Sequence, residues 1–352
     1  MRLKKWFAIV LAAAVLLSTL AGCGAALNGD TVVMTAGDKE ITYNEYQNWL
    51  LYAKNAFVSS YGEVSDWTKP LTTEATYETF LLDYTEGLIR YAAAIDENAA
   101  ALGIQLTDED YAQIKKAYET AALQYPSEDE FKAALVQNYG SMEFYNYMQE
   151  NNALYNRCFI EQYGENGEKL SDEEVLAFAE SQNYIWAKHI IIMKIDDDGN
   201  LLSDEEAAAA KAEAESILAR LDAYTGDDIE GYFDELMNAY SQDDGLEAFP
   251  DGYVFTEGDM VDEFYDGAIA LADYEYSGIV ESGFGYHIIL RLPLEPTCVP
   301  ISYFAYGYDL RYLAAESMFE SVVSGWWENL ELVKTDSYAK IDTIALLSEK
   351  DK

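Results

Sequence analysis

The hydrophobic pattern of the chain changes at residue 184, and this change constrains the fold more than any other feature. Before it, apolar residues recur at spacings of three and four, as in "YETFLLDYTEGLIRY", which is typical of amphipathic helices. Residues 184–195, "YIWAKHIIIMKI", form a continuous run rich in β-branched residues, as expected for a buried strand. A similar run, "YHIILRL", ends at residue 292, and helical patterns lie between the two. The sequence therefore predicts an α+β domain over residues 184–294.

Helical patterns flank this domain on both sides. Residues 32–182 begin with two short extended pieces around a turn at Gly37 and continue with helices. Several of these helices start with capping-box spacing, as at Thr42 and Glu45. Residues 301–352 return to a helix after three prolines and close with a segment, "AKIDTIAL", that we expect to be a short strand. At 352 residues the chain is too long for one ordinary core, so we expect two or three domains.

The N-terminus carries an export signal. A basic start, "MRLKK", precedes an uncharged stretch of 17 residues and then Cys23. The segment "LAGC" resembles a bacterial lipobox, in which the cysteine thiol receives a diacylglyceryl group. We therefore predict a signal peptide over residues 1–22, a lipid-anchored tether over residues 23–31, and an extracytoplasmic location on the bacterial cell membrane. The alternative is an uncleaved membrane anchor, which also places residues 24–352 outside the cytoplasm.

The charge balance excludes one class of partner. The chain has 22 Lys and Arg against 64 Asp and Glu, a formal net charge of −42. Such a surface repels the phosphates of nucleic acids, so we expect no nucleic-acid partner. Two further cysteines, Cys158 and Cys298, could pair outside the cytoplasm but form no disulfide framework. Without a CxxC motif, a histidine cluster or an acidic calcium loop, the sequence predicts no metal site and no cofactor.

The chain has two histidines, and both occupy the same kind of position. His189 directly precedes "IIIM" and His287 directly precedes "IILRL", so each lies at the mouth of an apolar strand. If the strands are neighbours, the imidazoles can meet across the pair. Each neutral ring offers one donor and one acceptor, so the rings can satisfy each other. From the pattern alone they are either a functional pair or two mutually satisfied core residues.

Four segments in order resemble the motifs of parvulin-type peptidyl-prolyl isomerases: "AKHIII", "AYSQDDG", "EGDMVDEFYDGAIAL" and "SGIVESGFGYHIILRL". The resemblance implies a small antiparallel sheet with surrounding helices, and it implies non-covalent rotation of X–Pro bonds without a cofactor. It also implies a set of site residues. The implied catalytic residues are His189, Asp243, His287 and Ser282, and the implied substrate-binding residues are Met260, Phe264 and Phe255.

One loop departs from that family. Where its members usually have Gly-Gly-Asp-Leu-Gly before the aromatic, this chain has "FPDGYVF", with Phe249-Pro250 in place of the paired glycines and Gly252 in place of the leucine. This change puts catalytic efficiency in doubt more than the fold. Phosphate-directed members need a basic cluster after the first strand, whereas the matching loop here is "IDDDGN". A phosphorylated substrate would be repelled there, so we expect ordinary X–Pro segments as substrates.

The segment "VVMTAGDKEITYNEY" resembles the start of the chaperone domain of PrsA- and SurA-type foldases. In that family an isomerase module is inserted between an N-terminal helical region and a C-terminal helix that packs back on it. The resemblance implies a chaperone-like domain over residues 32–182, with residues 301–352 packing on it. It further implies that the partners are unfolded or nascent exported proteins that contain X–Pro bonds.

Two other functions are compatible with parts of this pattern. One is a holdase, a chaperone that binds clients with a degenerate and inactive isomerase domain, which the altered loop favours. The other is a solute-binding lipoprotein that serves a transporter. That class requires two lobes of alternating strands and helices, and residues 32–182 lack the pattern.

Overall fold

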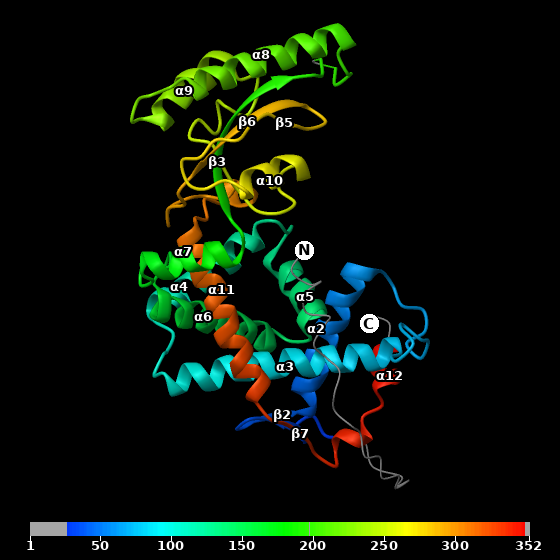
Figure 1. Cartoon of the computed structure of the whole chain (residues 1–352). Helices are drawn as coiled ribbons and strands as arrows, with labels where there is room; N and C mark the ends of the chain where they lie inside the picture. Colours follow the sequence, from blue (N-terminus) through cyan, green and yellow to red (C-terminus); the bar gives the residue numbers. More distant parts are fainter. Residues whose placement is uncertain (1–26, 197, 349–352) are drawn as a thin grey trace. The chain divides into compact units, whose positions relative to one another are not determined.

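The structure is a computed structural model that describes residues 27–196 and 198–348 (Figure 1). The predicted signal peptide and the predicted lipid site at Cys23 lie outside the described residues. Within the described ranges, no helix is both long and apolar enough to cross a membrane. Cys158 and Cys298 are buried thiols, and burial raises the pKa of the Cys158 thiol to about 11.

The chain divides into two compact units. One contains residues 27–161 and 319–348 of the described chain, and the other contains residues 162–318. The chain passes between them within helices α6 (Met142–Tyr163) and α11 (Leu310–Asn329). The second unit is therefore wider than the α+β segment expected from the sequence, and the functional division at residues 184 and 294 stays a prediction.

The first unit is mostly helical and contains a small sheet with the order β2-β1-β7. Strands β1 (Val32–Ala36) and β2 (Lys39–Thr42) form a hairpin, and β7 (Leu332–Lys334) pairs with β1 from near the other end of the chain. Thr42 caps the next helix: its hydroxyl accepts from the amide of Glu45, whose carboxylate accepts from the amide of Thr42. The remaining helices of this unit are α2 (Tyr43–Tyr61), α3 (Tyr77–Ala101), α4 (Asp108–Ala122), α5 (Glu128–Tyr139) and α12 (Thr343–Ser348).

The strand expected in "AKIDTIAL" is wrong. This segment forms the end of a 3-10 turn, η2 (Tyr338–Lys340), and most of helix α12. The carboxylate of Asp342 accepts from the amide of Ala345 and so starts a helix. Ile344 and Leu347, three residues apart, then both pack on the core, which is helical spacing rather than strand alternation.

The second unit is built on a four-stranded antiparallel sheet with the order β4-β3-β6-β5. Its strands are β3 (Ile185–Met193), β4 (Tyr253–Phe255), β5 (Val280–Glu281) and β6 (Gly285–Leu292), and its helical segments are α7 (Asp172–Ser181), α8 (Asp204–Asp222), α9 (Ile229–Tyr240), α10 (Asp262–Ile269) and η1 (Ile301–Tyr306). The sequence-based α+β prediction is confirmed.

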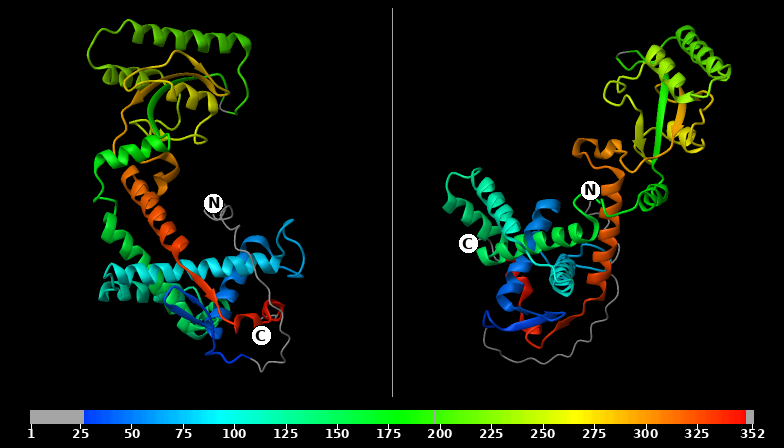
Figure 2. Two further views of the ribbon diagram at one scale, coloured as in Figure 1. Left: turned by 60° about the horizontal axis from the view of Figure 1, so that its bottom comes forward. Right: turned by 90° about the vertical axis from the view of Figure 1, so that its left-hand side faces the viewer.

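The two faces of this sheet carry different helices (Figures 1 and 2). Ile190 and Ile192 pack with α8 and α9 on one face. Ile185, Ala187 and Ile289 pack with α10 on the other. Because side chains alternate along a strand, His189 and His287 lie on the α10 face.

On the face of the sheet opposite the histidines, a buried lysine of β3 bonds to α9. Lys188 is only 3% exposed, and its Nζ donates to Glu230 at 2.9 Å and to Asp234 at 2.8 Å. A lysine is rarely buried to this degree without such partners. The interaction therefore fixes α9 against β3, and α9 leads directly into the loop that contains Asp243.

Replacing this lysine tests how much the buried charge pair matters. We expect Lys188→Ala to lower the free energy of unfolding by about 3 kcal/mol, because the two carboxylates then face each other without a cation. Lys188→Met keeps the packing of the aliphatic stem, so the loss should be smaller. Urea unfolding of the two variants measures this. Equal losses would show that the charge, which both variants remove, accounts for the effect, whereas wild-type stability in Lys188→Met would show that packing of the stem does.

Candidate active site

The two histidine rings meet on the α10 face of the sheet. In the antiparallel register of β3 and β6, His189 pairs with Ile289 and His287 pairs with Ile191, so the histidines are diagonal neighbours on one face. Their Nδ1 atoms are 3.2 Å apart, and the rings are nearly parallel with centroids 5.4 Å apart. The pairing that the sequence positions made possible is therefore formed.

Each ring has a second partner at its other nitrogen. Nε2 of His189 lies 2.9 Å from Oδ2 of Asp243. Nε2 of His287 lies 2.8 Å from Oγ of Ser282, and that hydroxyl also accepts from the amide of Phe284 at 3.1 Å. All four ring nitrogens are thus engaged in one chain that runs from Asp243 to Ser282.

Strand ends and loops hold the two outer members in place. The Asp243 loop is bound to the end of β3, because the amide of Gln242 donates to the carbonyl of Ile191 at 2.9 Å. The amide of Gly245 donates to Oδ1 of Asp243 at 2.9 Å and fixes the carboxylate locally. Ser282 stands in the tight connection between β5 and β6, where its amide donates to the carbonyl of Gly285.

The positions of the protons in this hydrogen-bonded series can be argued starting from Asp243, which lies at one end of it. Burial by itself raises the pKa of Asp243, but hydrogen bonds from His189, Tyr253 and the amide of Gly245 outweigh it and hold the pKa at about 2. The carboxylate is therefore only an acceptor, and Nε2 of His189 must donate to it. One assignment consistent with this end has Nδ1 of His189 accepting from Nδ1–H of His287, and Nε2 of His287 accepting from the Ser282 hydroxyl. Burial, followed by the neighbouring His189, lowers the pKa of His287 to about 3 and keeps this ring neutral.

Aromatic and apolar side chains line the histidine pair. The Phe264 ring presents its edge to both imidazoles, with centroid distances of 5.1 Å to His189 and 5.4 Å to His287. Met260 is half-buried and packs against the apolar cluster that contains Phe264. Phe255 is 0% exposed and lies 5.5 Å from Phe264. It therefore backs Phe264, and its predicted contact with a substrate stays a prediction.

Tyr253 belongs to this site and was missed by the sequence reasoning. Its hydroxyl donates to Oδ2 of Asp243 at 2.7 Å, and its ring lies edge-on to His189 at 5.7 Å. Burial, followed by the hydrogen bond to Asp243, raises the pKa of Tyr253 far above its usual range, so the hydroxyl stays a donor. The sequence could have predicted this, because Tyr253 stands two residues before Phe255 on the same strand and therefore lies on the same face of the sheet.

No metal-binding group is visible in residues 27–196 and 198–348: no cluster of three or more His, Cys, Asp or Glu side chains could hold an ion there. What the site offers is a fixed carboxylate, two hydrogen-bonded imidazoles and an apolar wall in a largely buried setting. Such a set can bind and polarise a ligand through hydrogen bonds.

Comparisons with known proteins identify this part of the chain. Residues 189–292 match the rotamase family, described as the PPIC-type PPIase domain. Foldase protein PrsA of Halalkalibacterium halodurans is 36% identical over 132 residues, which is 37% of this chain and 34% of that protein. The match thus spans about a third of the length of this curated relative.

Solved structures of PrsA also match. The protein from Bacillus cereus is 16% identical, with 92% of this chain and 100% of that chain covered and a TM-score of 0.33. The protein from Bacillus subtilis is 18% identical, with 86% and 91% covered and a TM-score of 0.26. These scores are too low to establish a shared arrangement of the whole chain.

The chain contains a PPIC-type PPIase domain of the parvulin type, as its motifs predicted.

NMR can test this proton assignment directly, because the spectrum contains signals from two imidazole rings that are easily told apart from each other by mutation. At neutral pH we expect His189 to carry its proton on Nε2 and His287 on Nδ1. A long-range proton–nitrogen NMR spectrum of the two rings distinguishes these tautomers. An Nε2–H tautomer at His287 would contradict the proposed direction of the chain, since the Ser282 hydroxyl could then not donate to that nitrogen.

The low pKa of His287 makes the fold sensitive to acid. An unfolded histidine titrates at about 6.5, so from about pH 6.5 down to about pH 3 the unfolded state binds a proton that the folded state rejects. The free energy of unfolding therefore falls as the pH is lowered. Between about pH 7 and about pH 5, wild type should lose about 2 kcal/mol more than His287→Asn, whose amide does not titrate. Urea unfolding at both pH values measures this, and identical losses would contradict it.

Proposed function

We propose that the PPIC-type PPIase domain of this chain is an active peptidyl-prolyl cis-trans isomerase and that the whole chain assists the folding of exported proteins. The observation that carries this proposal is the connected chain of Asp243, His189, His287 and Ser282 beside the apolar side chains of Met260 and Phe264. All of these residues lie within the matched segment 189–292.

The reaction requires no bond to be formed or broken. Rotation about a peptide bond has a barrier of about 18–20 kcal/mol because the C–N bond has partial double-bond character. The two isomers of an X–Pro bond differ by only about 0.5–1 kcal/mol yet exchange over tens to hundreds of seconds. A catalyst therefore has to bind the twisted amide more tightly than either planar form.

The residues of the site suit this task. Met260 and Phe264 supply an apolar wall for the pyrrolidine ring of proline. A planar amide places partial negative charge on its carbonyl oxygen, and twisting removes part of that charge. A fixed carboxylate at Asp243 near this oxygen disfavours the planar amide relative to the twisted one. His189, which is itself bonded to His287, holds that carboxylate in a water-poor setting, where its electrostatic effect is stronger.

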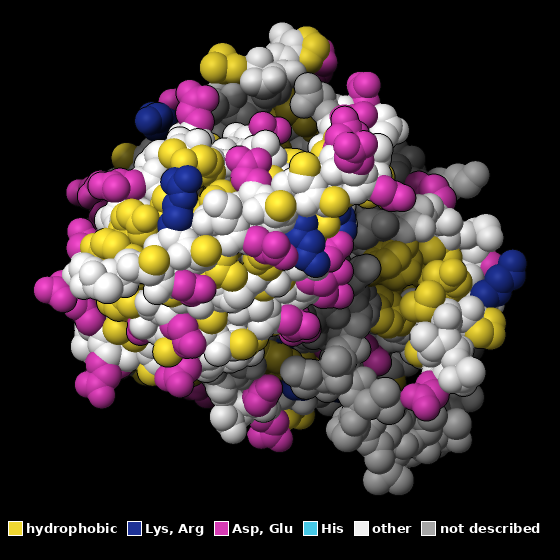
Figure 3. All heavy atoms as spheres, turned by 45° about the horizontal axis from the view of Figure 1, so that its top comes forward, with side chains coloured by type: hydrophobic (Ala, Val, Ile, Leu, Met, Phe, Trp, Pro, Cys, Tyr) yellow, Lys and Arg dark blue, Asp and Glu magenta, His cyan; other side chains and the backbone are white. Residues whose placement is uncertain are grey.

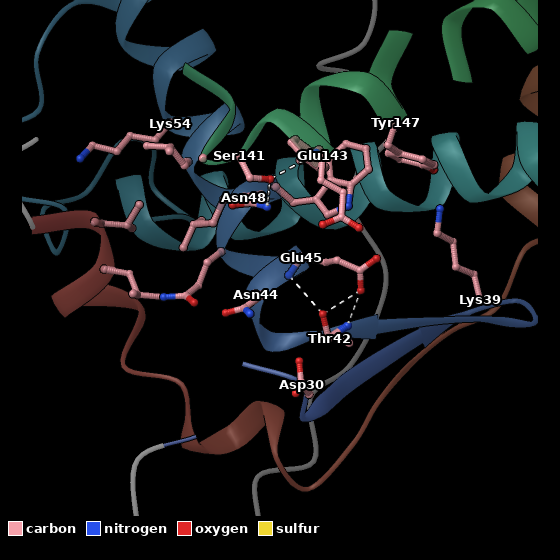
Figure 4. A pocket seen from close by; sticks show the side chains of 18 residues that line it. Asp30, Lys39, Thr42, Asn44, Glu45, Asn48, Lys54, Ser141, Glu143 and Tyr147 are labelled. Atoms are coloured by element: carbon pink, nitrogen blue, oxygen red, sulfur yellow. Dashed lines mark hydrogen bonds between the residues drawn. The ribbon is translucent and has the colours of Figure 1, made fainter. Parts of the chain in front are cut away.

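For the chaperone role we assign residues 32–182 together with residues 301–352. The first unit contains an open pocket of about 870 Å³ whose lining includes residues of α2, α6 and α12. Figure 4 shows Asn48 of α2 turned toward Ser141, with Lys54 and Tyr147 also around the pocket. Amide side chains beside partly exposed apolar ones, here Leu51 and Leu346, suit both the backbone and the side chains of an unfolded segment.

The proposed location is the outer face of the cell membrane, with a lipid on Cys23. The support is the lipobox-like segment, the basic N-terminus and the similarity of the chain to a PrsA foldase. Acidic side chains are spread over the face seen in Figure 3, and basic ones are few. With a net charge of −42, this surface is repelled by anionic headgroups, so a lipid and not surface charge would hold the protein there.

Catalysis of a proline-limited refolding reaction tests the proposed activity. Residues 24–352 should accelerate that reaction. His287→Ala and Asp243→Asn should each lower kcat/KM about tenfold or more, because each breaks the hydrogen-bonded chain. Met260→Ala should chiefly raise KM, since it removes part of the apolar wall.

The matched control is Asp273→Asn, which changes a half-exposed aspartate beside Arg291 elsewhere in the same unit. It should leave the rate unchanged. If wild type gives no acceleration yet suppresses the aggregation of an unfolded client, the isomerase proposal is lost. The holdase function then remains.

A further inference from the structure

We propose that Tyr253 is a positioning residue of this site, whose hydroxyl locks the Asp243 carboxylate in the orientation that the two histidines require. The inference rests on the proposed isomerase function and adds a residue to its machinery. Tyr253 stands in "FPDGYVF", the loop that departs most from the family pattern.

The hydrogen bonds around Asp243 carry the argument. Oδ2 receives two donors, Nε2 of His189 at 2.9 Å and the Tyr253 hydroxyl at 2.7 Å, while Oδ1 receives the amide of Gly245 at 2.9 Å. Three donors from three separate segments leave the carboxylate no freedom to rotate. Without the hydroxyl, Oδ2 would be held by His189 alone, and the ring and the carboxylate could turn together.

The loop opposite Tyr253 leaves room for that hydroxyl. A Cβ atom at position 245 would lie 2.0 Å from the oxygen of Tyr253, well inside any allowed contact. Gly245 therefore does two things, donating its amide to Asp243 and keeping the path of the tyrosine open. Glycine at 245 and tyrosine at 253 are fitted to each other.

Aromatic rings support Tyr253 from behind. The Phe249 ring lies 4.9 Å from that of Tyr253, and the Phe304 ring lies 4.7 Å from that of Phe249. Phe304 belongs to η1 and lies outside the segment that matches the isomerase domain. Tilted ring contacts at these distances restrict how a ring can swing. The site is thus supported by residues that the family match does not include.

The expected effect is on turnover more than on binding. The hydroxyl of Tyr253 contacts the carboxylate and not Met260 or Phe264, where the proline ring would bind. A misaligned catalytic group costs rate even when the substrate is held normally. In the full chain, Tyr253→Phe should lower kcat about tenfold and leave KM within about twofold, because the ring and its packing remain.

A double-mutant cycle separates positioning from a general structural loss. If Tyr253 acts through Asp243, adding Tyr253→Phe to Asp243→Asn should cost no further rate. The matched control is Tyr276→Phe, which removes another tyrosine–aspartate bond, to Asp222 at 3.1 Å, away from the site. The control should keep wild-type kcat. A Tyr253→Phe variant with wild-type kcat would overturn the proposal, as would fully additive losses in the cycle.

Two further variants test the packing around the hydroxyl. Gly245→Ala should push the tyrosine oxygen away and lower kcat as Tyr253→Phe does. Phe304→Ala should lower kcat in the same direction by a smaller factor, since it weakens the support without removing the bond. Wild-type kcat in Phe304→Ala would refute the role of η1.

NMR of the two imidazole rings distinguishes failure of this inference from failure of the proposed function. If wild type lacks isomerase activity, the proposed function fails. The ring spectrum still decides whether Tyr253 positions the site. Tyr253→Phe should shift the Nε2 signal of His189 and change its tautomer balance, whereas Tyr276→Phe should leave both unchanged. An unaltered His189 signal in Tyr253→Phe would overturn the positioning role.

Discussion

The second unit depends on the register between β3 and β6. Because side chains alternate along each strand, this register places every second residue of β3 against α8 and α9 and directs the others to α10. Ile190 and Ile192 thereby build one core while His189, between Lys188 and Ile190, reaches the opposite face. A slip of one residue would bury Lys188 among the apolar residues under α10 and send His189 into the other core. Lys188, held by Glu230 and Asp234 on its own side, makes that slip costly.

Burying two histidines and an aspartate is costly unless each polar atom has a partner. Here the chain from Tyr253 to Ser282 satisfies each ring nitrogen and both carboxylate oxygens with partners from different segments. The result is a polar group of fixed orientation inside an apolar wall. A functional site of this kind needs rigid polar atoms more than mobile ones, because catalysis by electrostatics requires dipoles that need not reorganise. The same connections that make the burial tolerable therefore make the site usable.

The sequence predicted the α+β class, the apolar strands and the meeting of His189 with His287, since all three depend on local period and on strand alternation. It failed at "AKIDTIAL", where one side-chain cap at Asp342 turned a strand-like segment into a helix. It also missed Tyr253, although alternation with Phe255 was visible. The sequence could not predict the short distance between Asp243 and Tyr253. That distance depends on how a loop of irregular backbone folds over the end of β3, and no periodic pattern specifies such a loop.

The loop at residues 249–255 departs from the pattern of the family. By residue type alone, it has lost two glycines, which are replaced by Phe249-Pro250, and a leucine, which is replaced by Gly252. In space, the added aromatic rings carry a hydroxyl to within 2.7 Å of the central carboxylate. Gly252 has a φ of +88° and lies so close to Ala187 that a Cβ would meet its carbonyl oxygen at 2.5 Å. A leucine in this backbone would be strained and would clash with β3, so Gly252 is what allows the loop to pass this close to Ala187. The altered residues are thus compatible with one another in this structure.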